Sequence, residues 1–443
     1  MNFVPSYKSI WKISYPIFLS LLAQNIIIVI DTAFLGRVGE IELGAGAIGG
    51  LFYVCLFILG FGFGTGTQIL VGRRNGEKNY KQIGNIVDHS IYFLIVLSIG
   101  LFFLTNFISS TVLKTIISSP DIYFFSQQYL DVRIWGLIFA FSNTAFRAFY
   151  IGITKTRYLI HSAVIMAIVN ISLDYLLIFG NYNFPQMGIR GAALASVIAE
   201  GASVIYFILV TIIKIDLKKY NLFRFPKLQV QVIKNILSVA IFIMMQHFFS
   251  IAGWFVFFMI IEQTGERPLA ASNIIRTMYM ILTIPIWGLG SATNTIVSNI
   301  IGQNRIDLVL PVIKRITKLS FLSILGVIIV TFIFAREIIS FYTNDQSLIE
   351  DTLGSLYVIL GVLVIFSLTI IVFNGVAGTA NTQISLGIEI ISIVVYIFTA
   401  YVLAIKLNSS TEVIWCSEYV YFIILGLLSY WYLLKGKWMK KVI

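Results

Sequence analysis

Twelve apolar segments divide this chain, and each is long enough to cross a lipid bilayer as a helix. Hydrophobic residues make up 58% of the sequence and charged residues only 12%, with a mean hydropathy of +0.92. Soluble domains are about half apolar, whereas one membrane-spanning helix needs about 20 mostly apolar residues. The sequence therefore predicts an all-α membrane protein with twelve transmembrane helices. They are expected near residues 9–36, 46–72, 85–112, 124–152, 158–180, 189–214, 230–262, 269–301, 317–341, 351–378, 384–405 and 411–434.

Lysine and arginine residues are distributed unevenly among the loops between these segments. Short cytoplasmic loops retain positive charge. With the N-terminus in the cytoplasm, 22 of the 31 Lys and Arg residues fall on the cytoplasmic side. Both termini are then predicted to face the cytoplasm. The net charge of +11 is spread over these loops instead of being gathered on one face, so it does not indicate nucleic-acid binding.

The second half of the chain repeats the first at an offset of 226 residues. Gly39-Glu40 matches Gly265-Glu266, and Gly76 matches Gly302, without a gap between them. An offset that contains six spans brings both halves into the membrane from the same side, as in parallel transporter repeats. The sequence predicts two pseudo-symmetric six-helix bundles: an N-lobe at 1–213, a cytoplasmic linker at 214–229 and a C-lobe at 230–443.

Two aspartates lie inside apolar segments of the first half. Asp31 is in the first segment, and Asp174 is in the fifth, four residues after Asn170 and therefore on the same helix face. An ionised side chain in hydrocarbon costs on the order of 3 kcal/mol, so such residues usually face a wet cavity and bind something. The repeat places Phe257, Tyr396 and Ala400 at the equivalent positions of Asp31, Asn170 and Asp174. Ionic chemistry is therefore expected mainly in the first half.

Other polar residues of the first half are candidates to line the same cavity. Gln24 precedes Asp31 by two helical turns, and Pro16, two turns earlier, removes a backbone donor and permits a bend. Ser196 and Glu200 are four residues apart in the sixth segment. Arg147, in the fourth segment, is the expected ion-pair partner of Glu200 or of the aspartates.

The second half offers fewer polar residues of this kind. Gln246 and His247 lie in the seventh segment and are predicted to line a cavity, although a lone histidine is more often a core residue. Glu389 and Glu418 have no partner at a suitable spacing. Cys55 and Cys416 show no metal or redox spacing, and no His/Cys/Asp cluster indicates a metal centre. No phosphate-binding loop occurs, so energy is expected to come from an ion gradient and no cofactor is predicted.

Taken together, these features resemble the multidrug and toxic compound extrusion (MATE) family, and within it the bacterial DinF-like branch. The resemblance depends on the first segment with Pro16, Gln24 and Asp31, the stretch 170–174, and the glycine-containing turns at 71–76 and 301–303. It implies a V-shaped pair of six-helix lobes in the bacterial inner membrane. Relatives with a second ion site place acids in the seventh and tenth helices, where this chain offers Gln246 to Ser250 and Phe366-Ser367-Leu368, so the resemblance argues against such a site.

The resemblance implies an antiporter, not an enzyme, that exports organic cations in exchange for H⁺ or Na⁺ by alternating access. Asp31, Asn170 and Asp174 are the expected cation-coupling residues, with H⁺ favoured although Na⁺ suits the same oxygens. Organic cations and membrane lipid are the expected partners, and the protein is expected to be a monomer. Two alternatives are a lipid-linked oligosaccharide flippase, which needs a basic cavity, and an intramembrane enzyme, which needs paired acids for Mg²⁺.

Overall fold

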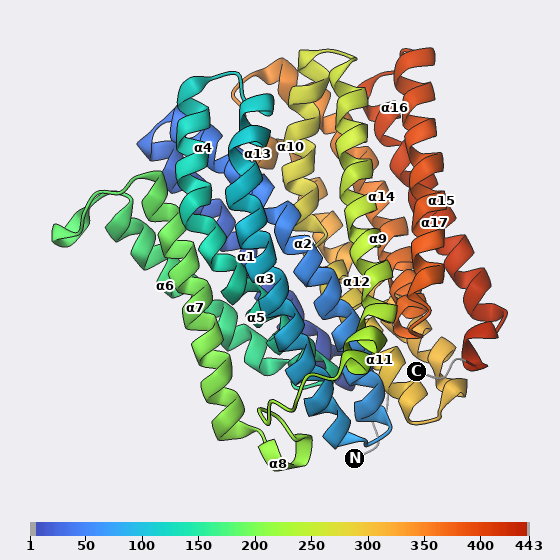
Figure 1. Cartoon of the computed structure of the whole chain (residues 1–443). Coiled ribbons are helices and arrows are strands. Elements are labelled where there is room, and N and C mark those ends of the chain that lie inside the picture. Colours follow the sequence, from blue (N-terminus) through green and yellow to red (C-terminus); the bar gives the residue numbers. More distant parts are fainter. Residues whose placement is uncertain (1–5, 441–443) are drawn as a thin grey trace. The chain divides into compact units, whose positions relative to one another are not determined.

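The computed structural model describes residues 6–440, and every regular element in this range is helical (Figure 1). The longest helices are α1 (Tyr7–Val38), α2 (Glu40–Gly76), α3 (Tyr80–Ile116), α9 (Val230–Glu262) and α14 (Gln346–Gly378). The other helices of the first half are α4 (Pro120–Arg133), α5 (Leu137–Gly152), α6 (Arg157–Leu177), α7 (Ile189–Lys214) and α8 (Leu217–Tyr220). Those of the second half are α10 (Glu266–Leu282), α11 (Ile284–Gly302), α12 (Val309–Ile333), α13 (Ala335–Ser340), α15 (Thr382–Tyr401), α16 (Thr411–Trp415) and α17 (Ser417–Leu434). The prediction of an all-α membrane protein is confirmed.

Helix length and composition give the expected number of spans. Among the described residues, eleven helical segments are long and apolar enough to cross a membrane, and the bent pair α10 and α11 makes a twelfth. The two helices of that pair meet at 47°, where a single helix over 269–301 was predicted. Pro285 follows the break, and a proline has no backbone N–H with which to continue the preceding helix.

The ninth span was predicted too late in the sequence. Expected over 317–341, it is formed by α12, which begins at Val309. Lys314, Arg315 and Lys318 made this stretch look like loop, but they lie within the first three turns of the helix. Charged side chains at a helix end can extend to water while the backbone remains helical, because their long aliphatic stems reach past the apolar layer.

Contacts divide the chain into two compact units. The first unit is Leu19–Met244, and the second unit contains the residues up to Phe18 together with those from Met245 onward. Phe18 and Met244 are themselves equivalent under the 226-residue repeat. Each unit therefore consists of one half of the repeat, except that the first part of α1 packs with the second unit and the first part of α9 with the first. The division of the sequence at 214–229 stays a prediction.

Glycines allow these exchanged segments to pack closely. In α2, a side chain at Gly60 or Gly64 would collide with α5, and one at Gly62 would approach Met244 of α9 within 2.7 Å. Residues two apart point to nearly opposite sides of a helix, so α2 has a glycine face toward each neighbour. In the second unit, a side chain at Gly288, the equivalent of Gly62, would approach Phe18 of α1 within 3.0 Å. Equivalent residues of the two halves therefore make equivalent helix contacts.

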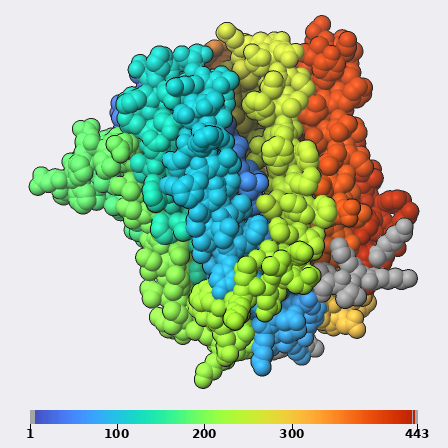
Figure 2. Space-filling view, viewed as in Figure 1, coloured from blue at the N-terminus to red at the C-terminus, as the bar shows by residue number. Residues whose placement is uncertain are grey.

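The segment that follows α8 is fixed on α3, and Figure 2 shows this face of the molecule. Asp88 accepts hydrogen bonds from the backbone N–H groups of Phe223 (3.1 Å) and Phe225 (3.2 Å). The Nε2 atom of His89 accepts one from the N–H of Gln229 at 2.9 Å. Asp88 and His89 are fully buried. The predicted linker is therefore held against α3 by side-chain to backbone hydrogen bonds.

Candidate functional site

Asp31 of α1 and Asp174 of α6 lie together in the first unit, with Asn170 one helical turn from Asp174. The carboxyl group of Asp31 interacts with the side chains of Asp174, Asn170 and Ser196. Asp174 and Asn170 are buried, at 0% and 1% exposed, and Asp31 is half-buried. Both oxygens of Asp174 and one oxygen of Asp31 accept no hydrogen bond from the described residues. Two facing carboxyl groups with so few donors are stabilised by a proton or a cation between them.

Asn170 connects this pair to α7. Its side-chain nitrogen donates to the hydroxyl of Ser196 at 3.4 Å, while its oxygen accepts no hydrogen bond from the described part of the chain. The helices α6 and α7 pack against each other (Figure 1). Ser196 of α7 lies beside Asp31, with which its side chain interacts. The structure therefore unites four of the residues singled out in the sequence, and all of them offer oxygen atoms.

Glu200 does not pair with Arg147. It forms a bidentate ion pair with Arg133, the last residue of α4, with N–O distances of 2.5 and 3.0 Å. The guanidinium also lies over the Tyr53 ring, 3.7 Å from its centroid, and the Tyr53 hydroxyl donates to Glu200. A side chain at Gly136 would occupy the place of this ion pair, so the glycine makes room for it.

The expectation that Arg147 pairs with Glu200 was wrong, because Arg133 takes that place. In the last turn of α4, Leu130 and Arg133 are buried, whereas Asp131 is exposed. Arg147 is half-buried on α5, with no ion pair or hydrogen bond to the described residues. The sequence signal that could have identified Arg133 is its position one turn after Tyr129, whose side chain interacts with that of Arg133.

The remaining predicted cavity residues are more scattered. Gln24 is half-buried on α1 in the first unit, and no hydrogen bond joins it to Asp31 among the described residues. Gln246 and His247 are half-buried on α9 and belong to the second unit. Pro16 lies inside α1, which is assigned as one continuous helix from Tyr7 to Val38. The predicted roles of these four residues stay predictions.

The second unit contains two buried acids whose partners the sequence did not reveal. Glu389 of α15 accepts hydrogen bonds from Ser250 and Tyr421, and Glu418 of α17 accepts them from Trp254 and Tyr396. Each partner is on another helix or several turns away. Pairing across helices leaves no local spacing in the sequence, which explains why these acids seemed isolated.

A family model named MatE matches residues 16–176 and 237–402, one match in each half of the repeat and together more than half of the chain. This chain belongs to the MatE family. Both matches include residues of the sites described above, with Asp31 and Asp174 in the first and Glu389 in the second.

Named relatives within the MatE family are similar over most of their length. The probable multidrug resistance protein NorM of Thermotoga maritima is 27% identical over 98% of this chain and 94% of its own. The NorM of Photorhabdus laumondii is 25% identical over 80% of this chain and 77% of its own. The probable multidrug resistance protein YoeA of Bacillus subtilis is 22% identical over 77% and 75%, respectively.

Solved MATE structures share the fold. The outward-facing conformation of a multidrug resistance MATE family transporter matches with a TM-score of 0.92 at 17% identity, covering 100% of this chain and 98% of the other. A MATE structure in the bent conformation matches with a TM-score of 0.85 at 17% identity, covering 97% and 94%. The MatE chain is thus a multi-pass membrane transporter and not an enzyme.

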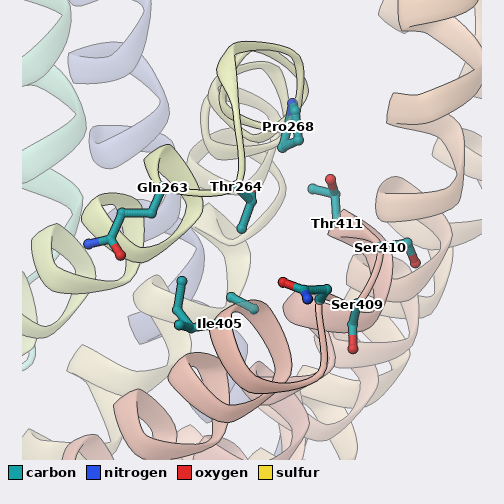
Figure 3. Close-up of a pocket in the computed structure, with 9 residues that line it drawn as sticks. Gln263, Thr264, Pro268, Ile405, Ser409, Ser410 and Thr411 are labelled. Carbon is teal, nitrogen blue, oxygen red and sulfur yellow. The ribbon is translucent and has the colours of Figure 1, made fainter.

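No group of three or more His, Cys, Asp or Glu residues that could hold a metal ion occurs within residues 6–440. The second unit of the MatE chain has a pocket of about 440 Å³ between the start of α10 and the loop before α16 (Figure 3). Hydroxyl and amide groups line it, among them Thr264, Ser410 and Thr411, and no acid or base does. Neither the two aspartates nor Glu389 or Glu418 lines this pocket, so it offers no titratable side chain for ion coupling.

Proposed function

We propose that this protein exports organic cations in exchange for protons by alternating access, and that the Asp31 and Asp174 pair couples the two movements. The observation that supports the proposal is a pair of facing carboxyl groups, one buried and one half-buried, in which both oxygens of Asp174 and one of Asp31 have no hydrogen-bond partner among the described residues. The relatives named as probable multidrug resistance proteins, which cover 98% and 77% of this chain, support the transported class. The protein is proposed to act as a monomer in the bacterial inner membrane, with both termini in the cytoplasm.

The coupling follows from competition for the same two carboxyl groups. Two like charges at about 4 Å repel by roughly 4 kcal/mol at an effective dielectric constant of 20, so the empty pair retains a proton or binds a cation. When protons occupy both groups, the attraction for an organic cation is lost and the cation leaves. When the protons leave, the cation site is restored. A site that holds either ligand, but not both, exchanges one for the other.

The ion pair of Arg133 and Glu200 keeps the surroundings of this site neutral. Without Glu200, the Arg133 guanidinium would be a strong partner for Asp31. Its positive charge already attracts the Asp31 carboxylate. Because Glu200 holds it in a bidentate pair, the aspartates remain available to mobile ligands. The same pairing removes Arg133 as a ligand for an anionic cargo, so no contact supports the flippase alternative.

The helix α1 contains residues of both units. Asp31 lies in the part of α1 that packs with the first unit, whereas Pro16 and Phe18 lie in the part that packs with the second. A bend at Pro16, where one backbone hydrogen bond of the helix is missing, alters the direction of one part relative to the other. We propose that protonation of Asp31 drives this bend.

Protons are proposed over Na⁺ as the coupling ion. Oxygen atoms of Asp31, Asn170, Asp174 and Ser196 would be the ligands of a sodium ion, and Ser196 already accepts a hydrogen bond from Asn170. Hard cations take about six or more oxygens in proteins, whereas a proton needs only one carboxylate oxygen. The two aspartates supply that without rearrangement.

Efflux of ethidium from vesicles tests the proposal. Vesicles containing the protein are loaded with ethidium, and either a pH gradient or a Na⁺ gradient is imposed. The pH gradient is expected to drive efflux, and Asp31→Asn and Asp174→Asn are expected to abolish the driven component, because an amide cannot exchange a proton. Asp121→Asn, on an exposed position of α4, is the matched control. Unchanged pH-driven efflux in both variants would overturn the coupling assignment, and efflux driven by Na⁺ alone would overturn the choice of ion.

A further inference from the structure

Two glutamates of the second unit are buried with uncharged partners only. Glu389 is 2% exposed, and its Oε1 atom accepts from the hydroxyl of Ser250 at 2.5 Å and of Tyr421 at 2.7 Å. No basic side chain among the described residues forms an ion pair with it. Burying a carboxylate without a cation is costly, whereas burying a protonated carboxyl group is not.

Glu418 has the same type of environment. It is 1% exposed, and its Oε1 atom accepts from the Tyr396 hydroxyl at 2.9 Å and from the Trp254 indole N–H at 3.3 Å. In both glutamates the donors converge on one oxygen, and within residues 6–440 no donor reaches the other oxygen, Oε2. An ionised carboxylate accepts at both oxygens, but a protonated one carries its hydrogen on the second.

Tyrosines connect the two acids. Tyr421 donates to Glu389 and Tyr396 donates to Glu418, and the two tyrosine rings lie 5.6 Å apart. Each hydroxyl can donate or accept, so each tyrosine can stay hydrogen-bonded to its glutamate in both protonation states. The other titratable groups around them are Tyr279 of α10, which interacts with Glu418, and His247, one turn before Ser250 on α9. The guanidinium of Arg276 is directed to the ring of Phe258 instead.

The repeat relates this cluster to the aspartate pair. Tyr396 occupies the position equivalent to Asn170, and Ser250 the position equivalent to Gln24. At the position of Asp31 stands Phe257, whose ring stacks on Tyr396 at 5.3 Å. The second unit therefore has acids at the corresponding place in its own half, but they are supplied by α15 and α17.

We propose that Glu389 and Glu418 form a second proton-binding site, which takes up and releases protons during the transport cycle. The inference rests on the proposed function, since it adds protons to the same exchange. A proton fits the site better than a metal ion or an organic cation does, because aromatic rings pack around the acids. Phe257, Tyr396, Tyr421 and Phe422 are in successive ring contacts. The proposal departs from the expectation that the second half contains no ion site.

Infrared spectroscopy of the purified protein tests the site directly, without transport. A pH titration of the wild type is expected to show protonated carboxyl absorption that is lost as the pH rises. Part of this titrating absorption is expected to be missing in Glu389→Gln and Glu418→Gln, which keep the size and the acceptor oxygen of the side chain. Glu262→Gln, on an exposed position of α9, is the matched control. A titrating band that is identical in the wild type and both variants would overturn the second site.

Proton counting then connects the site to exchange. Purified protein in weak buffer is mixed with ethidium, and the protons released per bound ethidium are measured with a pH indicator. Each Glu→Gln variant is expected to release about one proton fewer than the wild type when its acid titrates in the cycle. Asp174→Asn is expected to retain the release from the second unit. Release that is unaltered in Glu389→Gln and Glu418→Gln contradicts their part in transport. If the wild type releases no proton, the proposed antiport fails, while the infrared titration still decides whether the second site binds protons.

Discussion

The two units bury acidic side chains in different ways. In the first unit, Glu200 is neutralised by Arg133, and the nearby Asp31 and Asp174 face each other with three of their four oxygens unpartnered among the described residues. In the second unit, Glu389 and Glu418 each accept two hydrogen bonds from neutral groups. The two halves of one repeat have thus reached different solutions to the same problem, the high energy of a charge in an apolar interior.

The difference shows which acids are free to exchange ligands. A bidentate ion pair holds the Glu200 and Arg133 side chains together, because losing either partner would leave the other buried and alone. Hydrogen bonds from hydroxyl groups tolerate both forms of an acid, because a hydroxyl can donate or accept. A structural role is therefore proposed for Glu200, whereas the aspartate pair and the second-unit glutamates, which lack a fixed cation, are proposed to bind protons.

Breaking the ion pair should have the largest effect on stability. Arg133→Met leaves the Glu200 carboxylate buried and uncompensated, and is expected to reduce the free energy of unfolding by about 3–5 kcal/mol. The double variant Arg133→Met/Glu200→Met should recover most of this loss, since it removes both charges. Thermal unfolding of the purified protein in detergent provides the measurement.

The exposed ion pair between Arg336 and Glu350 supplies the matched control for this substitution. Arg336→Met is expected to change the free energy of unfolding by about 0.5 kcal/mol or less, because solvent screens the pair. Equal effects of the two Arg→Met substitutions, or a double variant as unstable as Arg133→Met, would contradict the structural role given to the buried pair.

Removing a neutral donor in the second unit should have a smaller effect. Tyr396→Phe deletes the hydroxyl that donates to Glu418 and keeps the ring that stacks on Phe257. The expected loss in the free energy of unfolding is about 1 kcal/mol while Glu418 is protonated, and about 2 kcal/mol once it is ionised. The loss should therefore increase as the pH of the unfolding experiment is raised. A loss that is independent of pH would show that Glu418 does not titrate.

Most of the fold could be predicted from the sequence because hydrocarbon imposes a simple requirement. Spans such as 189–214 and 230–262 begin and end where the apolar runs predict. Errors arose where a polar stretch is helical, as at the start of α12, and where Pro285 divides a run of apolar residues. In the site, Asn170 and Asp174 could be placed together from their spacing on one helix. The contacts of Arg133 with Glu200 and of Tyr396 with Glu418 could not, because they join helices whose packing the local sequence does not encode.

Proton movement driven by an ethidium gradient is the sharpest test of whether these acids couple the two flows. Proteoliposomes without an imposed pH gradient are given an ethidium gradient, and a trapped pH indicator follows proton movement. Coupling is mutual, so a flow of ethidium through an antiporter must move protons the other way. The wild type is expected to show this proton movement. The fourfold variant Asp31→Asn/Asp174→Asn/Glu389→Gln/Glu418→Gln is expected to carry ethidium without moving protons. Proton movement that persists undiminished in this fourfold variant would contradict the assignment of coupling to these acids.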